Sequence, residues 1–185
     1  PKTPQLEGMS LTDIARERKR PLGETVCELL LENKLQVGYR GAPPQSVAIT
    51  RQLARDQMEL LSRPDYVVGS DAIPVGGLPH PRAYGCFPRF LGRYRKMIPN
   101  VMSLETMIHR MTDNPARWFG LTNRGRVEKG YFADIAIFDA DRIIDNATWD
   151  DPKQFPAGIP YVLVNGQVAV DNEHCTGILA GQAVP

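Results

Sequence analysis

A carboxylate and an arginine stand close together near the middle of this 185-residue chain. The apolar run from Tyr66 to Val68 leads into Gly69-Ser70-Asp71, which predicts a buried strand that presents Asp71 at its carboxyl end. A glycine- and proline-rich loop follows and carries His80-Pro81-Arg82. Barrel enzymes place catalytic residues at strand ends and in the loops after them. We therefore expect Asp71 and Arg82 to belong to one active site.

The residue types allow two interpretations at each position. A carboxylate at the end of an apolar strand is costly to bury unless it is paired, hydrogen-bonded or metal-bound, so Asp71 suits catalysis, but it could also cap the following turn. A guanidinium can hold a carboxylate with two hydrogen bonds, so Arg82 suits a substrate acid, but a solvated loop arginine is equally compatible with the pattern.

Three further side chains lie in the same loop region. His80 could line the pocket or be structural, and Tyr84 could pack over a substrate or close the loop. Cys86 has no histidine placed nearby in sequence to activate it, so a thiol nucleophile is not expected.

Several sequence blocks resemble the N-acyl-D-amino-acid deacylases, or D-aminoacylases, of the amidohydrolase superfamily. The resemblance covers nearly the whole chain, more weakly before Tyr66, and Ala72 departs from it where the family usually has glycine. The matching blocks are Gly69-Ser70-Asp71, His80-Pro81-Arg82-x-Tyr84-Gly85, Phe87-Pro88-Arg89-x-Leu91-Gly92, Met111-Thr112-x-x-Pro115-Ala116, Arg124-Gly125-x-Val127-x-x-Gly130-Tyr131-x-Ala133-Asp134 and Val164-Asn165-Gly166.

This resemblance implies a zinc-dependent hydrolase that converts an N-acyl-D-amino acid to a carboxylate and a D-amino acid. It implies that Asp71 coordinates zinc and acts as the general base, and that Arg82 holds the substrate's α-carboxylate, with His80 and Tyr84 lining the site. The implied fold is α/β: residues 1–121 would form the last units of a (β/α)8 barrel, and residues 122–185 would supply C-terminal strands of a small β-sandwich.

The histidine content predicts that the metal site is incomplete in this chain. A catalytic zinc site needs three protein ligands, but the chain has three widely separated histidines and lacks the two-histidine motif of the resembled superfamily. We therefore expect the C-terminal portion of a longer enzyme, with other ligands from a missing N-terminal portion or a complementary chain. The alternatives are a cyclic-amide hydrolase similar to dihydroorotases and hydantoinases, or a non-catalytic scaffold or fragment.

Composition narrows the other functional classes. The chain is 42% hydrophobic and 23% charged, as in globular proteins, and its net charge of +1 gives no reason to expect nucleic-acid binding. No apolar run approaches the roughly 20 residues of a membrane span. Three widely spaced cysteines favour reduced thiols, which predicts a cytoplasmic location.

Hydrophobic periodicity and capping residues predict the elements that hold these side chains. We expect helices over 10–18, from Pro21 onward, over 45–61, over 90–98, from Ser103 and from Asn114 to Gly120. Strands are expected over 35–39, 66–68, 135–138, 161–164 and 167–170, with Asn165-Gly166 as a hairpin turn.

Overall fold

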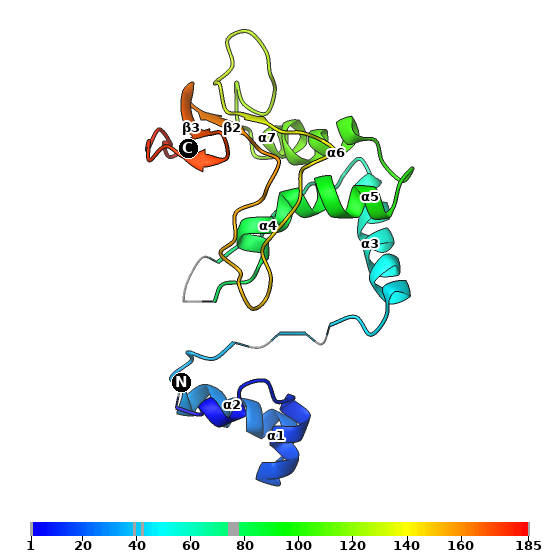
Figure 1. Cartoon of the computed structure of the whole chain (residues 1–185), viewed down its shortest axis with the longest axis vertical. Coiled ribbons are helices and arrows are strands. Elements are labelled where there is room, and N and C mark those ends of the chain that lie inside the picture. Colours follow the sequence, from blue (N-terminus) through cyan, green and yellow to red (C-terminus); the bar gives the residue numbers. More distant parts are fainter. Residues whose placement is uncertain (1, 39, 42, 74–77, 185) are drawn as a thin grey trace. The chain divides into compact units, whose positions relative to one another are not determined.

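The computed structural model describes residues 2–38, 40–41, 43–73 and 78–184. The chain divides into two compact units, residues 1–43 and residues 44–185, and each is considered by itself (Figure 1). All four residues that could form the candidate site lie in the second unit.

The first unit is a short helical hairpin. It contains η1 (Pro4–Leu6), α1 (Leu11–Arg18) and α2 (Leu22–Glu32). The Ser10 hydroxyl accepts a hydrogen bond from the Asp13 amide at 3.0 Å, which caps α1 as the sequence predicted.

The helices of the second unit enclose its apolar core. They are α3 (Val47–Ser62), α4 (Arg82–Pro88), the π-helical η2 (Arg89–Tyr94), α5 (Arg95–Met97), α6 (Leu104–Met111) and α7 (Asp113–Trp118). The segments α4, η2 and α5 run on without a break in the chain, so residues 82–97 form one helical stretch. Met58, Ile98, Met107 and Ile143 are almost completely buried in the core between these helices.

A four-stranded antiparallel sheet follows the helices. Its strands are β1 (Ile135–Ile137), β2 (Tyr161–Val164), β3 (Gln167–Asp171) and β4 (His174–Cys175), paired in sequence order. Asn165 and Gly166 both have positive φ angles, 48° and 80°, as a two-residue hairpin turn of this kind requires. The hairpin predicted at Asn165-Gly166 is confirmed.

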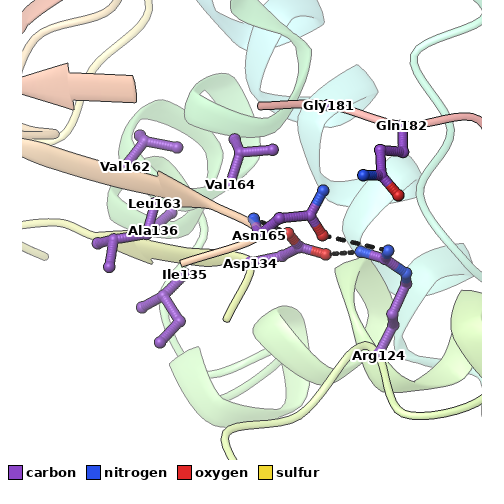
Figure 2. Close-up of a pocket in the computed structure, with 10 residues that line it drawn as sticks. All are labelled: Arg124, Asp134, Ile135, Ala136, Val162, Leu163, Val164, Asn165, Gly181 and Gln182. Carbon is purple, nitrogen blue, oxygen red and sulfur yellow. Dashed lines mark hydrogen bonds and ion pairs between the residues drawn. The ribbon is translucent and has the colours of Figure 1, made fainter. Parts of the chain in front are cut away.

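Arg124 ties this turn to the preceding loop. Its guanidinium forms an ion pair with Asp134 and donates a hydrogen bond to Asn165 Oδ1 at 3.3 Å, while the Asn165 amide donates to Asp134 Oδ1 at 2.8 Å. Figure 2 shows these residues around a cavity of about 340 Å³, which is also lined by residues of β1, β2 and the segment at Gly181. The guanidinium of Arg124 is thus engaged by residues next to the hairpin turn. The residues that line this cavity include none of the four candidate site residues.

The predicted helices are confirmed, but the one expected over 90–98 begins eight residues earlier, at Arg82. Arg82, Tyr84 and Cys86 therefore lie on a helix, and the loop predicted to carry them is wrong.

Two predicted strands are also wrong. Residues 66–68 and the described part of 35–39 (Tyr39 lies outside it) are extended or turn-like and join no sheet. A strand needs a hydrogen-bonded neighbour, and apolar β-branched composition does not supply one. The Val68 amide instead donates to the carbonyl of Arg110 at 3.1 Å. The predicted division at residue 121 stays a prediction.

Gly92 of η2 packs against the backbone of Ile143, in the long connection between β1 and β2. A β-carbon added to Gly92 would lie 2.0 Å from the carbonyl oxygen of Ile143. We expect Gly92→Ala to lower the free energy of unfolding of this unit by about 1–3 kcal/mol, since backbone must move to accept the methyl group. Chemical denaturation measures the loss. Gly181→Ala is the control within the same unit, because nothing lies within 4 Å of that position, and an equal loss there would contradict the explanation.

Candidate active site

Asp71 and Arg82 meet in the structure. The Arg82 Nη2 atom lies 2.7 Å from Asp71 Oδ2, and Arg82 is the first residue of α4. Asp71 has a left-handed backbone, with φ of 45°, and its side chain is 83% exposed. Asp71 and Arg82 are therefore close together, whereas the strand that was predicted to present Asp71 at its end is not formed. The proline- and glycine-rich stretch 74–77 between the two residues lies outside the described residues.

The guanidinium of Arg82 has an unused donor. Its Nε atom is buried and has no hydrogen-bond partner, and it is the only buried side-chain nitrogen or oxygen in this condition within the described residues. Buried donors are almost always satisfied, so an exception calls for an explanation. Arg82 thus has one N–H donor without an acceptor, in addition to the group that pairs with Asp71.

His80 supports the start of α4. Its Nδ1 atom accepts a hydrogen bond from the Arg82 amide at 3.0 Å, and its ring packs edge-on against Trp149 with centroids 4.5 Å apart. Partial burial lowers the pKa of His80 below its ordinary 6.5, and the positive charges of Arg82 and Arg89 act in the same direction. His80 is consequently neutral at neutral pH, which is the form that can accept the amide hydrogen at Nδ1.

This environment predicts a measurable titration. We expect Trp149→Ala to raise the pKa of His80 toward 6.5, because removing the indole exposes the imidazole to water. The ring resonances of His80, followed by NMR against pH, give the value, and Trp118→Ala on α7 should leave it unchanged. Because the folded pKa lies below the unfolded one, the contribution of His80 to stability is complete above about pH 6.5 and declines as the pH falls toward the folded pKa.

Tyr84 contacts a second aromatic residue from the same distant segment. Its ring and that of Phe155 lie edge-to-face with centroids 5.6 Å apart. Both Trp149 and Phe155 belong to the long connection between β1 and β2, which the sequence analysis did not connect with the site. The structure thus adds an aromatic pair to the four expected residues.

Asp145 anchors this connection to the helical stretch. Its carboxylate is fully buried, and it accepts hydrogen bonds from Arg89 at 2.7 and 2.9 Å and from Arg93 at 2.8 Å. Arg89 and Arg93 are four residues apart and so lie on one face of the helical stretch. No sequence signal identifies Asp145 as their partner, because it lies 56 and 52 residues away from them.

Cys86 lies on α4 and is partly buried. Burial raises the pKa of its thiol, although the positive charges of Arg82 and Arg89 partly oppose the shift. The Sγ atom lies 3.9 Å from the carbonyl oxygen of Gly69. A raised pKa favours the protonated thiol, which is the less reactive form.

The described side chains do not fit a complete metal site. Across residues 2–38, 40–41, 43–73 and 78–184, no three His, Cys, Asp or Glu side chains converge in a way that could hold an ion. His109 bonds to Asp113 at 2.9 Å, and His174 Nδ1 lies 2.7 Å from the carbonyl oxygen of Asn172. Asp71 is the one carboxylate among the four candidate site residues.

The chain matches known sequences along most of its length. The pattern of the amidohydrolase family matches residues 28–170. A D-aminoacylase of Alcaligenes xylosoxydans xylosoxydans is 34% identical over 181 residues, which are 98% of this chain and 34% of that protein. An N-acyl-D-glutamate deacylase of the same organism is 50% identical over 100 residues, 54% of this chain and 20% of that protein. The chain thus spans about a third or less of these curated relatives.

Solved structures of deacylases also superpose on most of this chain. A D-aminoacylase described as having a binuclear metal centre superposes with a TM-score of 0.73 at 34% identity, over 96% of this chain and 35% of that one. The N-acyl-D-glutamate deacylase of Bordetella bronchiseptica, bound to zinc and a phosphonate inhibitor, superposes with a TM-score of 0.66 at 33% identity, over 91% of this chain and 33% of that one.

None of the helices in the described residues combines the length and the apolar character that a membrane span requires.

Proposed function

Because this chain belongs to the amidohydrolase family, we propose that it supplies part of the active site of a zinc-dependent enzyme that hydrolyses N-acyl-D-amino acids. The observation that carries the proposal is the paired Asp71 and Arg82, with the unsatisfied Arg82 Nε beside them. A deacylase of this kind needs a base at the scissile amide and a cation at the α-carboxylate, and these two side chains have those properties.

Arg82 is proposed to bind the α-carboxylate of the substrate. The Arg82 side chain is 39% exposed, so an incoming carboxylate can reach its guanidinium beside Asp71. The hydrogen bond from the Arg82 amide to His80 fixes the backbone from which the guanidinium extends. His80 therefore positions Arg82, and a neutral imidazole adds no competing positive charge to the site.

Asp71 is proposed to be the general base and one metal ligand. As a base it takes a proton from the attacking water while the new carbon–oxygen bond forms. It then delivers this proton to the amine nitrogen, so that the carbon–nitrogen bond breaks and the amine leaves. Zinc supplies Lewis-acid polarisation and a more acidic water when it is bound. The remaining ligands would come from an upstream part of the same polypeptide or from a complementary chain, since the described residues offer no other cluster of donors.

The proposed architecture follows from the same family membership. Residues 1–121 would be the last units of a (β/α)8 barrel, and residues 122–185 would contribute strands to a small β-sandwich. This arrangement explains why the apolar run 66–68 joins no sheet here: its neighbours would be barrel strands outside this chain. A cytoplasmic location stays a prediction, supported by three unpaired cysteines.

The test is substrate selectivity of the complete zinc-supplemented enzyme, meaning this chain together with the proposed upstream or complementary part. We expect turnover of an N-acetyl-D-amino acid and none of its L enantiomer. Dihydroorotate and a hydantoin serve as the cyclic-amide comparison. Preferential turnover of a cyclic substrate would replace the proposal with the rival hydrolase, and absence of turnover in a correctly folded, zinc-loaded preparation would favour a non-catalytic subunit.

A further inference from the structure

Asp145 is a buried charge that the proposed reaction does not use. Its side chain is completely buried, and both carboxylate oxygens are bound by arginines of the helical stretch 82–97. Arg89 donates to Oδ2 through Nε at 2.9 Å and through Nη2 at 2.7 Å, and Arg93 donates to Oδ1 through Nε at 2.8 Å. A buried ion pair of this kind adds little net stability over apolar packing, but its directional hydrogen bonds fix the geometry of the groups that it joins.

The start of α4 has little support of its own. Pro81, which precedes the helix, provides no side-chain hydrogen bond to cap it, and Gly85 in its first turn is a poor helix former. Helix ends fray unless they are held. Arg82 is the first residue of α4, so apart from the bond between its amide and His80 its position depends on contacts from other parts of the chain.

Asp145 packs directly against this first turn. A β-carbon added to Gly85 would lie 3.1 Å from the β-carbon of Asp145, so the connection between β1 and β2 runs close along α4 (Figure 1). Gly85 lies one turn after Arg82. The segment that Asp145 anchors also carries Trp149, whose ring contacts that of His80 with centroids 4.5 Å apart. The start of α4 is thus held from this segment at two points.

We infer that Asp145 is a positioning residue, which holds the start of α4 and so directs Arg82 toward the α-carboxylate of the substrate. The inference rests on the proposed function, in which Arg82 binds that carboxylate. Asp145 is assigned no contact with the substrate, so its effect on catalysis passes through Arg82.

A purely structural role for Asp145 predicts a different result. If Asp145 only stabilises the fold, its loss lowers the amount of active enzyme and affects every substrate alike. If it positions Arg82, its loss affects a substrate acid more than the corresponding amide, because the amide has no carboxylate for Arg82 to hold. The ratio of kcat/KM for N-acetyl-D-leucine to that for N-acetyl-D-leucinamide, both measured as release of acetate, separates the two roles. The amount of active enzyme cancels from this acid-to-amide ratio.

We expect Asp145→Asn in the complete zinc-loaded enzyme to lower the acid-to-amide ratio about 10-fold, because a misplacement on the order of 1 Å can cost about 100-fold in rate. Asparagine keeps the size of the side chain but loses the charge that binds two arginines. Asp145→Asn combined with Arg82→Lys should give the same ratio as Arg82→Lys alone, since changes that act through one group are not additive.

Arg93→Gln is a milder second variant. It leaves both hydrogen bonds from Arg89 to Asp145 in place, so it should lower the acid-to-amide ratio by less than Asp145→Asn does. The Arg93 side chain is 45% exposed, so the fold should tolerate the change. If Asp145→Asn yields no folded enzyme, Arg93→Gln decides by itself.

Asp113→Asn is the matched control. The Asp113 side chain is also buried, at 9% exposed, and is bound by Arg117 at 2.9 Å and by Arg126 at 2.6 Å. Its loss should lower the stability measured by chemical denaturation. It should leave the acid-to-amide ratio unchanged, because its arginines lie on α7 and in the chain after α7, and not on α4.

Three results overturn the inference while the proposed function stands. They are an unchanged acid-to-amide ratio in the folded Asp145 and Arg93 variants, an equal fall of the ratio in Asp113→Asn, and additive effects of Asp145→Asn and Arg82→Lys. A wild-type enzyme that is inactive on every N-acyl-D-amino acid overturns the proposed function first, and the inference with it.

Discussion

Replacement of Asp71 by asparagine is expected to lower kcat for an N-acyl-D-amino acid by about 10²- to 10⁴-fold, the usual contribution of a positioned general base. The amide is nearly the same size as the carboxylate but accepts no proton at neutral pH. The Asp71 side chain is 83% exposed and makes a single ion pair, so the fold should tolerate the change. Steady-state kinetics on the complete enzyme, with zinc content measured in the same sample, gives the result.

Asp65→Asn is the matched control for this prediction. Asp65 is also an exposed aspartate, 54% accessible, and pairs only locally with Arg63 at 3.3 Å. It should keep wild-type kcat and zinc content. Equal activities of the Asp71 and Asp65 variants would remove Asp71 from the mechanism. A fall in zinc content of the Asp71 variant alone would mean that metal binding accounts for part of the lost activity.

The local part of the fold could be predicted from the sequence. Serine caps at Ser10 and Ser103 identified helix starts, and Asn165-Gly166 identified the hairpin, because each signal acts within a few residues of itself. The two strands that were wrongly predicted, over 35–39 and 66–68, fail for the complementary reason. Their apolar pattern indicates that these segments tend to be buried in a sheet. Whether a strand forms depends on a neighbouring strand that is distant in sequence, which the local pattern does not identify.

In the candidate site, too, contacts between residues close in sequence could be predicted, and contacts with a distant segment could not. Asp71, His80, Arg82 and Tyr84 lie within 14 positions of one another, and the structure indeed joins Asp71 to Arg82 and His80 to Arg82. Trp149 and Phe155 belong to a distant segment, which a buried carboxylate, Asp145, ties to two arginines of the helical stretch. Since arginine pairs are commonly solvated, their spacing alone could not reveal that contact.

Arg82→Lys is expected to lower kcat/KM for N-acetyl-D-leucine by roughly 10- to 100-fold, since charged hydrogen bonds contribute about 1.5–3 kcal/mol each and lysine cannot reproduce the two-pronged geometry. The decisive comparison is the same substrate with its α-carboxylate converted to an amide. On that substrate the wild type and the variant should perform alike, because Arg82 has no acid to hold. Arg63→Lys, at an exposed arginine paired with Asp65, should behave as wild type on both. An equal loss on both substrates would mean that Arg82 acts through its 2.7 Å contact with Asp71 and not through the substrate carboxylate.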